Sequence, residues 1–69
     1  MAESVYKVIE LVGTSDKSWE RAAEAAVKRA GQSLRDLRIA EVTKLDVKVE
    51  NGKVTQFRTR LSLSFKYDA

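Results

Sequence analysis

The chain has 69 residues, of which 43% are hydrophobic and 33% are charged, and its formal net charge is +3 from 13 basic and 10 acidic residues. This composition is typical of a folded globular domain and excludes a disordered or membrane-embedded chain. Because the sequence contains no Cys and no His, it also excludes disulfides, thiolate nucleophiles, imidazole bases and ordinary zinc or haem sites. A domain this small buries only a modest core, so we expect oligomerisation to supplement it.

A strand is predicted over residues 5–12, where apolar side chains occupy both faces. Ile9 and Leu11 share one face, and Val8 and Val12 share the other. A strand that is apolar on both faces has to be covered on both. We therefore expect the chain's own helix on one side and a neighbouring copy of the chain on the other.

An amphipathic helix is predicted from Trp19 to about Leu34, after a turn that begins at Gly13. Its apolar stripe is mostly Ala, which lets a helix lie close to a sheet but buries little area per residue. Trp19 lies on this stripe, so we expect it to pack in the core. Gly31 indicates either close packing or a weakened last turn. The candidates for the helix N-cap are Ser15, Asp16 and Ser18.

Two further strands are predicted over residues 39–49 and 54–67. In the first of these, the apolar positions change from even to odd numbers, which predicts a bulge between Val42 and Leu45. The last strand alternates between an apolar face and a polar, cationic face. The order of elements is therefore strand, helix, strand, strand, within a single domain of residues 1–69.

The hairpin between the last two strands contains Asn51 and Gly52, a typical turn pair. A two-residue turn would set apolar positions of one strand opposite polar positions of the other. We therefore predict a three-residue loop over residues 50–52, with Gly52 in the left-handed conformation. The resulting strand pairs are Leu45 with Phe57 and Val47 with Thr55.

No segment approaches the ~20 apolar residues that a membrane span requires. Residues 1–4 lack the basic and apolar regions of a signal peptide, so we expect a cytoplasmic protein. The excess of positive charge is weak and spread along the chain, which permits an anionic ligand without requiring nucleic acid.

Four segments carry a resemblance to a known family. Residues 5–15 (VYKVIELVGTS), 37–42 (LRIAEV), 51–54 (NGKV) and 61–65 (LSLSF) fit the family pattern in register and without gaps. On these segments the chain resembles the dodecins from end to end. The resemblance implies an α+β fold, a β-α-β-β subunit whose three-stranded antiparallel sheet partly wraps the helix, with twelve copies closing into a hollow shell. It also implies storage or quenching of a ligand, without enzymatic turnover.

Many dodecins hold flavins between a Trp that stacks on the ring and a Gln that bonds to its edge, and this chain departs from both. Ile39 stands at the position of the Trp, and Arg58, which has donors but no acceptor, stands at that of the Gln. Asp46 stands where some relatives carry an Arg that holds a phosphate-bearing ligand. Loss of the stacking ring alone is expected to cost about 1–3 kcal/mol, with base–aromatic stacking as the analogue. The three positions equivalent to the family's ligand site are therefore Ile39, Asp46 and Arg58.

The segments 18–20 (SWE) and 38–40 (RIA) resemble a subgroup of dodecins for which calcium, rather than flavin, has been proposed as the ligand. Calcium takes six to eight oxygen ligands, and no loop here has the spacing of an EF-hand. A calcium site would therefore be assembled between subunits, from ligands that the sequence does not identify.

Arg60 and Lys66 follow Arg58 on the predicted polar face of the last strand and are the candidates for contact with an anion. Two other interpretations stay open: a solvated strand face, or ion pairs between subunits with Asp46 or Glu41. Glu10, which lies among apolar residues, is a further candidate for contact with a basic partner.

The favoured hypothesis is a non-enzymatic, homododecameric binding or storage shell with a degenerate flavin site, which binds flavin weakly, binds calcium, or binds no small ligand. The alternative is a functional store for riboflavin or FMN. The expected partners of the protein are other copies of the chain and a small ligand. A nucleic-acid binder is disfavoured because exposed aromatic residues are missing, and neither a membrane partner nor an enzymatic reaction is expected.

Overall fold

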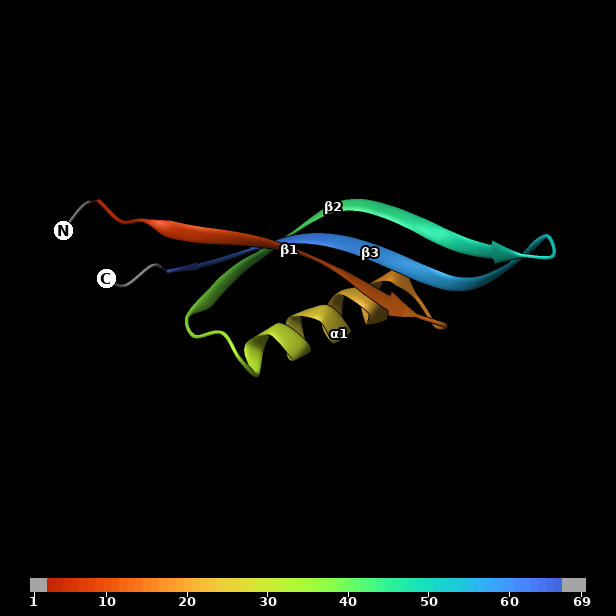
Figure 1. The fold of residues 1–69 in the computed structure, drawn as a ribbon, viewed down its shortest axis with the longest axis horizontal. Coiled ribbons are helices and arrows are strands. Elements are labelled where there is room, and N and C mark those ends of the chain that lie inside the picture. Colours follow the sequence, from red (N-terminus) through yellow and green to blue (C-terminus); the bar gives the residue numbers. More distant parts are fainter. Residues whose placement is uncertain (1–2, 67–69) are drawn as a thin grey trace.

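One helix and three strands follow each other in the computed structural model, which describes residues 3–66. The elements are β1 (Tyr6–Ser15), α1 (Trp19–Gly31), β2 (Leu37–Glu50) and β3 (Lys53–Lys66). The strands form one antiparallel sheet of order β1-β3-β2, so the last strand lies in the middle (Figure 1). The predicted α+β class, the β-α-β-β order and the antiparallel sheet are confirmed. Tyr67, which the sequence placed at the end of the last strand, lies outside the described residues.

The molecule is elongated, with extents of 54 × 20 × 15 Å. The helix α1 lies on one face of the sheet, mainly over β1 and β3, and the β2–β3 hairpin extends past its end (Figure 1). The fully covered apolar core is correspondingly small and consists of Ala22, Ala26, Ala30, Leu61 and Leu63. As the Ala-rich stripe predicted, the helix approaches the sheet closely without burying large side chains of its own.

Gly13 is the contact that allows this close approach. The turn predicted to begin at Gly13 is wrong, because β1 continues through Gly13 to Ser15. A Cβ atom at this position would overlap the carbonyl oxygen of Ala22 and lie 3.0 Å from the Cβ atom of Ala26. The glycine is required because the backbone of the helix lies directly against the backbone of the strand.

The helix begins after Ser18, whose hydroxyl accepts a hydrogen bond from the backbone N–H of Arg21 at 3.0 Å. Ser18 is thus the N-cap among the three candidates. The helix ends at Gly31, earlier than predicted. Apart from its chain neighbours and the backbone of its own helix, no atom would lie within 4 Å of a Cβ at Gly31, so this glycine does not mark close packing. Leu34 follows the helix and still packs against the core.

The hairpin between β2 and β3 differs from the prediction in its loop length and in its strand register, so the predicted three-residue loop is wrong. Glu50 pairs with Lys53, so the turn has two residues, and Asn51 and Gly52 both have positive φ, of 52° and 75°, as a type I′ turn requires. A two-residue turn alone would set apolar positions of one strand opposite polar positions of the other. A bulge at Thr55 prevents this mismatch, and the Thr55 hydroxyl donates to the carbonyl of Lys48 at 3.4 Å. The observed pairs are Val47 with Phe57 and Leu45 with Thr59.

The predicted bulge in the second strand is confirmed. The register shifts between Val42 and Lys44, which leaves Thr43 as the extra residue, and the Thr43 hydroxyl donates to the carbonyl of Arg60 at 3.2 Å. This bulge moves the apolar side chains of β2 from even to odd positions while keeping them on the side of the sheet that carries α1.

Candidate ligand-binding face

The face of the sheet that points away from α1, called the outer face below, carries most of the candidate site residues. On β3 it is formed by the even-numbered residues, because the odd-numbered Thr59, Leu61 and Leu63 are buried under the helix. Val8 and Val12 of β1 face the same way and remain 56% and 47% exposed. The outer face is thus an open, mixed surface of charged side chains, hydroxyls and half-exposed valines.

The strongest polar contact on this face joins Arg58 to Asp46, which lie opposite each other on β3 and β2. Arg58 Nε donates to Asp46 Oδ1 at 2.8 Å, and Arg58 Nη2 donates to Asp46 Oδ2 at 3.3 Å. Both carboxylate oxygens are therefore occupied by the same guanidinium group. The ion pair that the sequence left open between subunits is formed within one chain.

The pair shifts both pKa values in the direction of the charged forms. The hydrogen bond from Arg58 lowers the pKa of Asp46, assisted by the charges of Arg58 and Arg60 and opposed by partial desolvation. The same hydrogen bond raises the pKa of Arg58. Because the pKa of Asp46 in the folded protein lies below its ordinary value of 3.8, the pair stabilises the fold above that pH. This contribution is lost as the pH falls through the folded-state pKa.

Replacement of Asp46 by asparagine is therefore expected to lower the free energy of unfolding at neutral pH and to leave it unchanged at acidic pH. Urea unfolding of the wild type and Asp46→Asn between pH 7 and pH 2 should give a difference that shrinks as the pH falls below 3.8. Asp36→Asn is the matched control, because Asp36 contacts Arg38 only at 3.8 Å, and we expect a smaller effect. A difference for Asp46→Asn that does not change with pH would contradict this assignment.

Trp19 links the helix to the strands beside this ion pair. Its indole Nε1 donates to the backbone carbonyl of Asp46 at 3.0 Å, and its ring meets Phe57 edge-on with centroids 5.1 Å apart. The buried Thr59 hydroxyl donates to the backbone carbonyl of Trp19 at 2.8 Å. Trp19 thus packs against the strands, as predicted, although it stays partly exposed. Sequence reasoning missed its bond to Asp46, because the pattern carries no information on contacts between α1 and β2.

Within one chain the predicted site residues are only partly brought together. Ile39 pairs with Ser64, six residues from Arg58 along β3 and therefore about 20 Å away. Ile39 is 61% exposed on the outer face. Lys66 is equally distant from Arg60, at the far end of the strand. Asp46, Arg58 and Arg60 form one group, whereas Ile39 and Lys66 lie apart from it.

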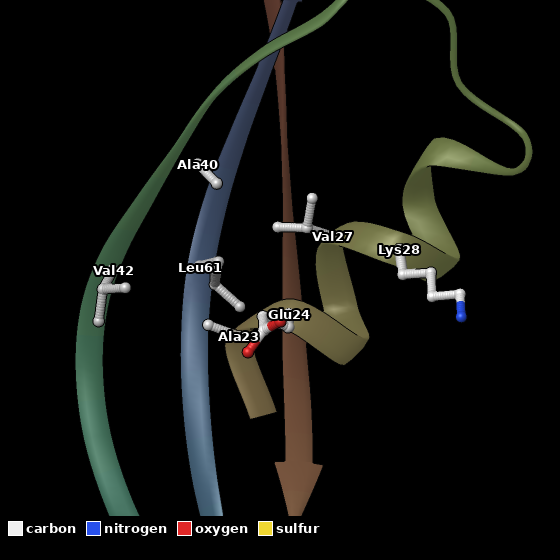
Figure 2. Close-up of a pocket in the computed structure, with 7 residues that line it drawn as sticks. All are labelled: Ala23, Glu24, Val27, Lys28, Ala40, Val42 and Leu61. Carbon is white, nitrogen blue, oxygen red and sulfur yellow. The ribbon is translucent and has the colours of Figure 1, made fainter. Parts of the chain in front are cut away.

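On the opposite side of the sheet, apolar grooves run between α1 and β2. The larger groove has a volume of about 400 Å³ and is walled by Ala40 and Val42 of β2, Leu61 of β3 and the helix (Figure 2). A second groove, of about 360 Å³, runs from Val42 and Leu45 to Trp19. Val42 and Leu45 are 49% and 52% exposed, because the helix is too narrow to cover β2. One chain therefore leaves the apolar row of β2 without a cover.

Comparison with known proteins agrees with this geometry. The family model for dodecin matches residues 5–68. The chain belongs to the dodecin family. It is 52% identical over 64 residues to the calcium dodecin of Mycobacterium tuberculosis, with 91% of this chain and 89% of that protein covered.

Solved dodecin structures have the same fold. A dodecin from Streptomyces coelicolor superposes with a TM-score of 0.92 at 38% identity, covering 100% of this chain and 99% of that one. The calcium dodecin of Mycobacterium tuberculosis, described as a calcium-chelating antigen with a novel calcium-binding site, superposes with a TM-score of 0.84 at 46% identity, covering 94% and 93%.

The described part of one chain contains no cluster of metal-binding side chains. Among residues 3–66, no three Asp or Glu side chains come close enough together to hold a metal ion. No helix in that range is long and apolar enough to cross a membrane.

Proposed function

We propose that this chain is a non-catalytic subunit of a hollow homododecamer that binds a small ligand, and that calcium is favoured over flavin. The observation that carries the ligand preference is the two-bond ion pair between Asp46 and Arg58. It occupies two of the three positions equivalent to the family's ligand site, and the third is the aliphatic Ile39.

The uncovered apolar surface supports the assembly. Large apolar side chains are about half exposed on both sides of the sheet, for example Val8 and Val12 on the outer face and Val42 and Leu45 beside the helix. A monomeric protein rarely leaves so much apolar area open. A second copy of the chain is the occupant that fits, because a domain of this size needs additional burial to be stable.

The chemistry of the outer face argues against a flavin. Ile39 offers no ring to stack on an isoalloxazine, and the guanidinium of Arg58 is already directed at Asp46. A flavin that approached Arg58 would have to compete with a carboxylate held at 2.8 Å. Each of these differences weakens flavin binding, and together they favour another ligand.

Calcium is supported by the relatedness to a calcium dodecin at 52% identity and by the chemistry available to the chain. With no His and no Cys, the residues that remain to bind a metal are oxygen donors, which suit calcium. The site would lie between copies, since one chain does not gather three carboxylates within residues 3–66.

The test combines native mass with two ligand titrations on one metal-free preparation. We expect a mass of twelve subunits, a calorimetric signal on addition of Ca²⁺ that exceeds the signal from Mg²⁺, and little quenching of riboflavin fluorescence. The double variant Ile39→Trp and Arg58→Gln restores the stacking ring and the edge acceptor, so it should bind riboflavin at least tenfold more tightly than the wild type. This variant is the positive control for the riboflavin assay.

Other outcomes would contradict separate parts of the proposal. If the wild type quenches riboflavin as strongly as the double variant, the flavin-storage alternative is supported. If Ca²⁺ gives no more heat than Mg²⁺, the calcium preference is wrong. A monomer or dimer would overturn the proposed shell.

A further inference from the structure

The outer face holds a second pair of opposed side chains, and in this pair both are cations. Lys44 of β2 and Arg60 of β3 lie directly opposite each other. On each strand they are two residues away from Asp46 and Arg58. Arg60 lies between the buried Thr59 and Leu61 and so points to the outer face, as does its partner Lys44. Like charges directly opposite each other on a sheet destabilise it.

No carboxylate of the described chain neutralises this pair. The ion pairs among residues 3–66 join Asp36 to Arg38, Glu50 to Lys48 and Asp46 to Arg58, and none includes Lys44 or Arg60. On one side of the pair the acid in the adjacent row is Asp46, and both of its oxygens are bonded to Arg58. Arg60 is near enough to contribute to the lowered pKa of Asp46, but it forms no bond with it.

The residues next to Lys44 and Arg60 on the outer face decide from which direction an anion can approach them. The β1 neighbour of Arg60 is the uncharged Val12, and the neighbour of Arg58 is Thr14, whose side chain carries a hydroxyl. Glu10 and Glu41 lie beside Ser62, about 7 Å further along the strand in the opposite direction. The two rows that hold Lys44, Asp46, Arg58 and Arg60 contain three cations and one carboxylate, whereas the row at Ser62 adds only carboxylates. The positive charge is therefore concentrated at Lys44 and Arg60 and on the side of Arg58.

We propose that Lys44 and Arg60 form a binding site for a phosphoryl group on the outer face. An arginine fork and a lysine ammonium on adjacent strands present donors to one small multivalent anion, and the anion removes the repulsion between them. The Asp46–Arg58 pair borders the site and, because it is neutral overall, adds no net charge to it. This site is distinct from the Ile39 position and does not depend on calcium binding.

The test measures phosphate binding in calcium-free buffer by calorimetry and by the phosphate-dependent rise in Tm. Wild-type protein should bind inorganic phosphate, and K44Q and R60Q should each weaken binding about tenfold, as expected for loss of a charge-assisted hydrogen bond. The matched control is K48Q, which removes a lysine from the same strand and face but one that is paired with Glu50 at 3.4 Å. K48Q should change phosphate affinity less than twofold. K44Q should also raise the Tm measured without phosphate, because it removes the opposed charge.

Two phosphate sources are distinguished by comparing inorganic phosphate with ribose 5-phosphate, with ribose as the uncharged control. Tighter binding of ribose 5-phosphate assigns a phosphorylated metabolite, and equal affinities assign free phosphate. Equal losses of phosphate affinity in K44Q and K48Q would indicate a non-specific effect of positive charge and overturn the proposal. The absence of phosphate binding to the wild type would overturn it as well. A K44Q variant with altered native mass but unaltered phosphate affinity would assign the cations to a subunit contact and also overturn it.

Discussion

Replacement of Gly13 by alanine is expected to destabilise the fold by about 3 kcal/mol, the upper part of the usual range for overpacking. The added Cβ would overlap the backbone carbonyl oxygen of Ala22, so relief requires movement of the helix and not rotation of a side chain. Because α1 covers the sheet mainly through small residues such as Ala22 and Ala26, displacing it opens the whole core. Urea unfolding at one fixed protein concentration measures the change, since the proposed assembly would make stability depend on protein concentration.

Gly31→Ala is the matched control for this prediction. It adds the same methyl group at the last residue of the same helix, where the new Cβ would meet no atom within 4 Å beyond its chain neighbours and the helix's own backbone. It should be neutral or stabilise the protein by up to about 1 kcal/mol, because alanine favours the helix. Similar losses for both variants would show that the close approach at Gly13 is not what limits stability.

Replacement of Val42 by glutamate is expected to break the proposed shell into small species. Val42 borders both grooves beside the helix and is 49% exposed in one chain, so a neighbouring copy that fills the grooves would bury it. An unpaired carboxylate in such a contact costs several kcal/mol, and the cost is repeated in every copy. Native mass spectrometry and size-exclusion chromatography should report the loss of the high-mass assembly.

Ser33→Glu is the control for this variant, because it introduces the same charge at an exposed position outside the grooves. It should retain the wild-type mass. If Val42→Glu also retains that mass, the grooves face solvent in the assembly, and another apolar surface, such as Val8 and Val12 on the outer face, holds the copies together.

The register of the hairpin explains why part of the candidate site was not predictable. The three-residue loop would have paired Leu45 with Phe57, whereas the observed pairing places Leu45 opposite Thr59 and Asp46 opposite Arg58. The difference arises because Asn51 and Gly52 form the two-residue turn and the extra residue, Thr55, lies beyond it. The local sequence indicated that one extra residue is needed to align the apolar positions of the two strands, but not where it lies. An extra residue in the loop or at Thr55 restores the shared apolar face equally well.

The sequence was sufficient to derive the elements and their order, the Ala-rich helix face and the bulge near Thr43, and it predicted assembly with other copies of the chain. Each of these follows from periodicity, composition or chain length, which are local or global properties of the sequence. The tertiary structure alone decided that Asp46 bonds Arg58, that Lys44 opposes Arg60 and that Gly13 lies against the helix backbone. These contacts depend on register and on the distance between α1 and the sheet, which are set by packing between segments far apart in the chain.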